Sequence, residues 1–138
     1  MAGSGRAMRR AVAERARERC EYCRCPEAYV GSSFCLEHIV PKAAGGPTRS
    51  ENLAFACPGC NAFKGDKTAA FDPATREAAR LFHPRRVVWE MHFRWSADPR
   101  LAASHWYRRV TVTTLRLNRP ALRNLRCALQ AIGVHPPE

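Results

Sequence analysis

Two Cys-x-x-Cys pairs constrain the fold of this chain more than any other feature of its sequence. Cys20 and Cys23 form the first pair, and Cys57 and Cys60 form the second. Two such thiolate pairs are the commonest way to build a tetrahedral zinc site in a protein. We therefore predict that these four cysteines bind one structural zinc ion.

This interpretation depends on the cysteines staying reduced. The sequence contains no run of 18 or more apolar residues, and its first ten residues, MAGSGRAMRR, lead into no apolar stretch. We therefore expect no membrane span, no secretory signal and a cytoplasmic location, where clustered cysteines bind metal rather than form disulfides. Cys25 and Cys35 are spare thiols that could compete as zinc ligands.

The segment between the two pairs is longer than a plain zinc ribbon needs. It holds 33 residues, against roughly 15–20 in a ribbon, where a hairpin is enough to join the knuckles. The additional length carries an acid–histidine pair, Glu37-His38, and a Gly-Gly loop, and Asn61 directly follows the second cysteine pair. The spacing therefore predicts that the two cysteine pairs and their zinc ion hold a second, functional site in place.

The net charge of the chain indicates which class of molecule it binds. The formal net charge is +11 and the pI is near 10.1, which favours polyanions, with nucleic acid ahead of anionic membrane. Of the 23 basic residues 20 are arginines, whose guanidinium groups match phosphate geometry. A GC-rich genome would also raise the arginine content, so the bias by itself leaves both explanations open.

Local patterns predict an α+β fold class. We expect a flexible N-terminus over residues 1–5 and one domain over residues 6–138, with a core at 20–68 and an extension at 69–138. Within the core the expected order is strand, strand, short helix, following an N-terminal helix over Arg6–Arg19. In the extension we expect a strand over residues 87–95 and then two helices separated near Pro120.

The combined motifs resemble the HNH endonucleases, the ββα-metal nuclease family. The matching parts are CEYC and EHIVPKAAGGPTRSENLAFACPGCNAFKG, which together cover residues 20–65. Acid–His, Gly-Gly, Asn-Leu and Cys-x-x-Cys-Asn-x-x-Lys occur in the family order, with Asn61 in place of the final histidine. The chain is thus similar to a His–Asn–Asn variant, and the resemblance implies a small zinc-stapled ββα core.

The resemblance also implies roles for four residues, and their chemistry agrees with these roles. His38 would be the general base that activates water. Glu37 and Asn61 would bind a catalytic Mg²⁺ or Mn²⁺ ion through oxygen atoms. Asn52 would hold the loop and His38 in place by backbone hydrogen bonds. Lys64 has two open interpretations, as a phosphate contact or as a solvated helix residue.

The expected function is metal-dependent hydrolysis of DNA phosphodiester bonds by a one-metal mechanism. DNA would be held mainly through its backbone, with little sequence dependence. Two alternatives remain open at this point, a non-catalytic zinc-ribbon-like nucleic-acid-binding module and a degenerate HNH subunit. The binding module explains the charge and the cysteines but gives Glu37 and His38 no role.

Overall fold

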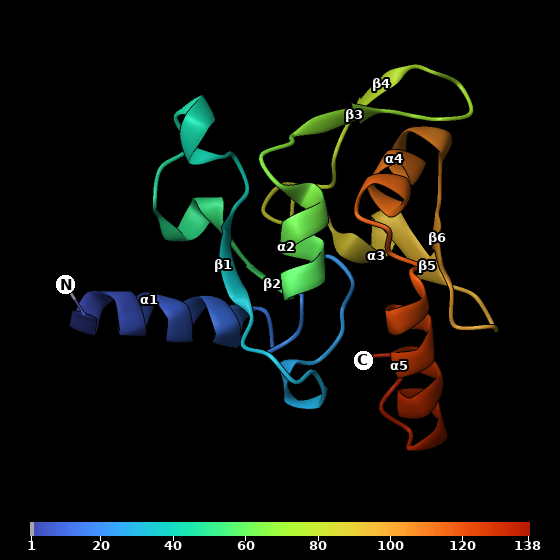
Figure 1. The fold of residues 1–138 in the computed structure, drawn as a ribbon, viewed down its shortest axis with the longest axis horizontal. Coiled ribbons are helices and arrows are strands. Elements are labelled where there is room, and N and C mark those ends of the chain that lie inside the picture. Colours follow the sequence, from blue (N-terminus) through green and yellow to red (C-terminus); the bar gives the residue numbers. More distant parts are fainter. Residues whose placement is uncertain (1) are drawn as a thin grey trace. The chain divides into compact units, whose positions relative to one another are not determined.

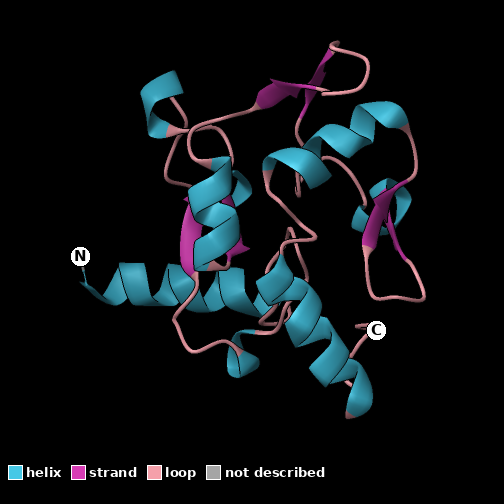
Figure 2. Cartoon of the chain, turned by 45° about the vertical axis from the view of Figure 1, so that its right-hand side comes forward, coloured by secondary structure: helices cyan, strands magenta, loops and turns pink. Residues whose placement is uncertain are grey.

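The computed structural model describes residues 2–138, and the chain divides into two compact units, Met1–Lys67 and Thr68–Glu138. Each unit combines helices with small antiparallel sheets (Figures 1 and 2). This mixture confirms the predicted α+β fold class. Among the described residues, every helix is too short or too polar to cross a lipid bilayer.

The first unit contains the predicted strand–strand–helix order. Helix α1 (Ala2–Arg15) is followed by β1 (Cys35–His38), β2 (Leu53–Ala56) and α2 (Pro58–Lys64) (Figure 1). The strands pair antiparallel, with Glu37 opposite Ala54 and His38 opposite Leu53. Three short 3-10 turns lie at Glu27–Tyr29, Lys42–Ala44 and Ser50–Asn52. The ββα core is therefore present between the two cysteine pairs and just beyond the second.

Helix α1 includes residues 2–5, which the sequence predicted as a flexible lead, and it ends four residues before the predicted end. Arg17 and Glu18 both have positive φ angles, of 55° and 58°. Non-glycine residues in this left-handed region cannot continue a helix, so the chain turns here toward Cys20. Because α1 ends early, the first cysteine pair lies on a loop and not on the helix.

The core of the first unit joins α1 to the sheet. Val12 of α1 is buried, all of β2 is buried, and the rings of Phe34 and Phe55 lie 5.2 Å apart between centroids. Arg15 donates to the Leu53 carbonyl at 2.6 Å, and Arg9 donates to the Phe34 carbonyl at 2.6 Å. The hydrophobic and hydrogen-bonding contacts together fix β2, the strand that leads into the second cysteine pair.

The second unit consists of two hairpin-like pairs of strands and three helices. Strands β3 (Ala69–Phe71) and β4 (Ala78–Arg80) pair antiparallel, as do β5 (Phe93–Trp95) and β6 (Leu101–Ala103). The helices are α3 (Trp89–His92), α4 (Trp106–Thr114) and α5 (Pro120–Ala131). The two predicted C-terminal helices are present, with α5 beginning at Pro120.

An ion pair between a buried carboxylate and a partly exposed arginine fixes α4 within the second unit. Asp72 is fully buried and accepts two hydrogen bonds from Arg109, at 2.9 and 2.7 Å. This bidentate contact holds the pKa of Asp72 well below its usual range. The peptide N–H of Thr75 adds a third donor at 2.8 Å. The carboxylate therefore links the turn after β3 to α4.

The predicted strand over residues 87–95 is wrong in its first half. Trp89, His92 and Phe93 are buried while Glu90 and Met91 are exposed, which is the i, i+3, i+4 burial pattern of a helix. Helix α3 brings the Trp89 and Phe93 rings to 5.2 Å. From Phe93 onward the chain is extended. The β3–β4 hairpin and β6 were not predicted, because three-residue strands carry too little alternation to recognise.

Candidate functional site: a four-cysteine cluster beside a histidine

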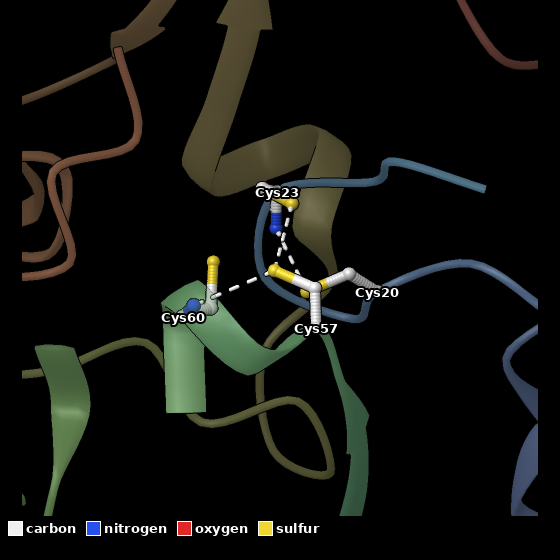
Figure 3. Close-up of side chains that lie close together, drawn as sticks. All are labelled: Cys20, Cys23, Cys57 and Cys60. Carbon is white, nitrogen blue, oxygen red and sulfur yellow. Dashed lines mark hydrogen bonds between the residues drawn. The ribbon is translucent and has the colours of Figure 1, made fainter. Parts of the chain in front are cut away.

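The four predicted cysteines come together at the start of α2. Cys20 and Cys23 lie on the loop after α1, while Cys57 precedes α2 and Cys60 lies in its first turn (Figure 3). Their four sulfur atoms are all within 4.8 Å of one another, and all four residues are buried. The peptide N–H groups of Cys23 and Cys60 point at the sulfurs of Cys20 and Cys57, at 3.5 and 3.4 Å.

This cluster fits a zinc ion by the chemistry of its donors. Burial raises the pKa of the Cys23 thiol well above its usual value, so ionising these buried sulfurs without a cation is costly. A divalent ion removes that penalty, and four thiolates in tetrahedral reach are a typical structural zinc site. The cluster could therefore hold the predicted zinc. Cys25 is a fifth buried thiol, with its sulfur 3.2 Å from that of Cys23.

His38 lies at the end of β1 with its ring half-buried. Its Nε2 atom is 2.9 Å from the hydroxyl oxygen of Thr48, which fixes the orientation of the ring. Burial, and after it the positive charge of Lys42, lowers the pKa of His38 below the usual 6.5. The imidazole is therefore neutral at physiological pH, the state that a general base requires.

Asn52 closes the loop that follows His38. Its amide oxygen accepts the Val40 N–H at 2.9 Å, and its amide nitrogen donates to the carbonyls of Val40 and Pro47, at 3.0 and 2.9 Å. The side chain therefore uses both its donor and its acceptor to tie the two ends of the loop together.

Gly46, in the same loop, packs very closely against the backbone of Val40. A Cβ atom at this position would lie 1.8 Å from the Val40 carbonyl oxygen and 2.9 Å from the amide nitrogen of Asn52. Only glycine permits this approach, because a contact of 1.8 Å with a backbone oxygen is a steric overlap. Close packing against Val40 therefore explains why Gly46 of the Gly-Gly motif is a glycine.

Glu37 points away from His38, into the interior of the first unit. Its carboxylate is 3% exposed, and it accepts hydrogen bonds from Lys64 Nζ and from the Tyr22 hydroxyl, each at 2.5 Å. Burial raises the pKa of Glu37, although Lys64 and Tyr22 favour its charged form. The alternation of side chains along a strand places neighbours such as Glu37 and His38 on opposite faces.

Lys64 is a buried residue, so both earlier interpretations of it are wrong. It is 1% exposed, and besides Glu37 its ammonium donates to the carbonyls of Ile39 and His38, at 3.0 and 3.4 Å. It therefore ties the end of α2 to the backbone that carries His38. A sequence signal existed, because Lys64 is four residues after the buried Cys60 and so lies on the same face of α2.

Asn61 lies on α2 next to Cys60 and is half-buried. Its N–H donates to the Cys57 carbonyl and its carbonyl accepts the Gly65 N–H, both at 3.0 Å, as in a regular helix. Within residues 2–138, no hydrogen bond joins the Asn61 side chain to Glu37 or His38. The structure thus fixes the backbone of Asn61 through the cysteine cluster and leaves its amide available.

The residues expected to hold a catalytic ion fit that role unequally. Mg²⁺ keeps several waters and binds exposed oxygens, whereas both Glu37 oxygens are buried and already hydrogen-bonded. Glu37 therefore does not fit as a ligand to an exchangeable ion in this arrangement. In the part of the chain that the structure describes, the cysteine cluster is the one group of three or more His, Cys, Asp or Glu residues able to hold a metal.

Comparison with known proteins agrees with this geometry. Residues 20–67 match the family model described as HNH endonuclease, a segment that begins at the first cysteine of the cluster and ends three residues after Lys64. No curated protein and no solved structure matches the chain significantly. The segment with the cysteine cluster, the ββα core and His38 is therefore similar to the HNH endonucleases.

Proposed function

We propose that this chain is an endonuclease that hydrolyses phosphodiester bonds of DNA, with His38 as the general base. The observation that carries the proposal is the neutral, accessible imidazole of His38 in an HNH domain. The backbone around His38 is held from two sides. Lys64 binds the carbonyl of His38 and that of Ile39, and Asn52 binds the following residue, Val40. A general base needs this positional control, because proton transfer requires hydrogen-bond geometry.

The Thr48 contact assigns the two ring nitrogens of His38 different tasks. If Nε2–H donates to the Thr48 hydroxyl oxygen, Nδ1 carries the free lone pair. Nδ1 then takes a proton from the attacking water, and the Thr48 bond stabilises the ring in this tautomer. The lowered pKa of His38 keeps the ring ready to accept that proton over most of the physiological range.

A divalent ion, Mg²⁺ or Mn²⁺, would neutralise charge on the phosphate. The amide oxygen of Asn61 supports its binding better than Glu37 does, since the Glu37 carboxylate is already engaged by Lys64 and Tyr22. Such an ion would complete its coordination with substrate phosphate oxygens and water, as Mg²⁺ commonly does. The cysteine cluster would bind zinc separately and hold Asn61 through Cys60.

The charge of the chain favours a nucleic acid as substrate, and the likeness to HNH endonucleases makes that nucleic acid DNA in this proposal. The net charge of +11 comes mainly from arginine, which contacts phosphates without reading sequence. We therefore propose backbone-dominated binding that weakens steeply as the salt concentration rises.

The test is a plasmid-nicking assay on wild type and His38→Ala, with Mg²⁺, Mn²⁺ or Ni²⁺ added to metal-depleted buffer. Zinc content and melting temperature should match in the two proteins, since His38 lies outside the cysteine cluster. We expect divalent-dependent cleavage by wild type and a loss of roughly 10²–10⁴-fold in His38→Ala.

The pH dependence adds a second readout. The acid limb of kcat/KM should lie below pH 6.5, because the pKa of His38 is lowered and protonation removes the base. If wild type shows no divalent-dependent cleavage, or cleaves no faster than His38→Ala, the chain is a binding module or a degenerate subunit.

A further inference from the structure

The hairpin of β3 and β4 is a two-stranded ribbon with one packed face and one exposed face (Figure 1). Ala70 and Ala79 lie opposite one another and are half-buried on the face toward α4, which contacts both strands. Side chains alternate along a strand, so the residues on either side of these two point the other way. Four exposed residues share that other face: Ala69, Phe71, Ala78 and Arg80.

Phe71 places an aromatic ring on the exposed face of the ribbon. Its exposed fraction is 73%, the highest among the large apolar side chains that the structure describes. The residue across from it is Ala78, so the neighbouring strand leaves the ring uncovered. One exposed apolar side chain is ordinary by itself, and the surroundings of the ring decide whether it has a partner.

The turn between the two strands is held rigidly. The buried Asp72 carboxylate accepts the N–H groups of Thr75 and Ala74, at 2.8 and 3.2 Å, besides its two bonds from Arg109. The Arg76 N–H donates to the Asp72 carbonyl at 2.7 Å and so closes the turn. A preorganised hairpin loses little conformational entropy when it binds. The ribbon therefore presents its exposed face and its tip in a fixed shape.

Two arginines of the ribbon are available to an anion. Arg76 at the turn and Arg80 on the exposed face are both exposed, and within residues 2–138 neither side chain has a hydrogen bond or an ion pair. Of the two acids in the hairpin, Asp72 is already paired with Arg109. The second unit has twelve arginines and no lysine against five acidic residues, which is more than half of the chain's net charge of +11. This charge favours a polyanion as partner.

Duplex DNA matches the shape, the charge and the apolar ring together. Its major groove is about 12 Å wide and admits a two-stranded β-ribbon, and phosphates line both edges of the groove. The C5-methyl group of thymine projects into this groove and offers an apolar contact to a ring. An anionic lipid surface would match the charge, but binding there scales with buried apolar area, and Phe71 is the one large apolar residue on the exposed face.

We propose that the exposed face of the β3–β4 ribbon enters the major groove of duplex DNA. Arg76 and Arg80 contact phosphates at the edges of the groove, and Phe71 packs against the edges of the bases. The inference rests on the proposed function for the choice of DNA and names the surface of the second unit that binds it. Binding through the ribbon requires no cleavage.

The first test uses the full chain carrying His38→Ala, without divalent ion, so that DNA stays intact. Affinity for a labelled duplex of alternating adenine and thymine is measured by fluorescence anisotropy at several salt concentrations. Arg76→Asn should reduce the slope of log affinity against log salt by about 1, because one phosphate contact is lost. Asparagine tolerates the positive φ of 61° at this position, so the turn keeps its shape. Arg100→Gln is the control, since Arg100 is exposed in the same unit but paired with Asp98, and it should leave the slope unchanged.

The second test asks whether Phe71 lies in the major groove. Phe71→Ala should weaken binding to the same duplex by about 5- to 50-fold, as expected when a ring that DNA covers is removed, and leave the melting temperature unchanged. Uracil in place of thymine removes only the methyl group of the major groove. This replacement should weaken binding by about 2- to 4-fold when Phe71 is present and have no effect on Phe71→Ala. Met91→Ala, at a residue 66% exposed on α3, is the control for loss of an exposed apolar side chain.

Three results would each overturn the proposal: an unchanged salt slope in Arg76→Asn, a Phe71→Ala loss no larger than that of Met91→Ala, or an equal effect of uracil with and without Phe71. Binding to vesicles of anionic phospholipid that depends on Phe71, with DNA binding that does not, would assign the ribbon to a membrane instead. Wild-type protein that cleaves no DNA but shows the expected ribbon effects would reject only the proposed function.

Discussion

Lys64 donates three hydrogen bonds inside the first unit, to Glu37 and to the carbonyls of His38 and Ile39. A buried ammonium and carboxylate are each expensive to desolvate and are tolerated because they neutralise one another. The pair also joins α2 to the end of β1, so it positions the proposed base without touching substrate. At the scale of single residues, Lys64 is thus a buried link between α2 and the end of β1.

Lys64→Met should therefore destabilise the protein, because it leaves Glu37 buried with only the Tyr22 hydroxyl as partner. We expect the free energy of unfolding in urea to fall by about 3–5 kcal/mol, as is typical when one partner of a buried pair is removed. Lys67→Met is the matched control, since Lys67 is exposed. Adding Glu37→Gln to Lys64→Met should recover part of the loss. Had Lys64 been a phosphate contact, the variant would lose DNA affinity and keep its stability.

At the scale of elements, the loop between β1 and β2 decides where His38 lies. Asn52 ties Val40 to Pro47, and Gly46 packs so closely on the Val40 carbonyl that no Cβ atom fits. Strand β1 ends at His38, and the chain enters this loop at Ile39. The loop therefore fixes the direction in which the backbone leaves His38, the residue proposed as the general base.

Gly46→Ala should displace the loop, since a Cβ atom 1.8 Å from a backbone oxygen forces the chain apart. We expect a loss of about 1–3 kcal/mol in unfolding free energy, the usual cost of overpacking, together with reduced cleavage. Gly31→Ala is the control, because a Cβ atom at Gly31 meets nothing within 4 Å. Equal melting temperatures for the two alanine variants would contradict the packing argument.

At the scale of the whole molecule, the cysteine cluster belongs to the first unit and the tryptophans belong to the second. Trp89, Trp95 and Trp106 all follow Thr68, while the four clustered cysteines all precede it. The emission of tryptophan therefore reports on the second unit alone. Each unit has a buried core of its own, and a single domain over residues 6–138 remains a prediction from the sequence.

Removal of zinc with a strong chelator, or the change Cys57→Ser, should unfold the first unit, because a zinc ion in the cysteine cluster would link its loop, strand and helix. We expect circular dichroism to lose part of the helical signal while tryptophan emission keeps its native maximum. Metal analysis of the untreated protein should find one zinc per chain. If emission shifts together with the circular dichroism signal, the two units fold as one domain, as the sequence predicted.

Spacing and residue type in the sequence determined the cysteine cluster, the strand–strand–helix order and the start of α5 at Pro120. Cys-x-x-Cys pairs and a helix-starting proline act over a few residues, so no tertiary contact is needed to recognise them. The likeness of the segment around the cysteine pairs to the HNH endonucleases could also be recognised from the sequence, because the motifs occur in the family order along the chain.

Tertiary structure alone decided what Glu37 and His92 contact. Adjacent residues in the EH motif look equivalent in sequence, but the pleat of β1 sends Glu37 to Lys64 and Tyr22 and leaves His38 half-buried beside Thr48. His92 packs against Phe82 and Phe93 in the interior of the second unit, because a helical turn forms in a segment whose local pattern favoured a strand. The direction of a side chain and the satisfaction of a buried polar group depend on neighbours distant in sequence, and local patterns do not encode them.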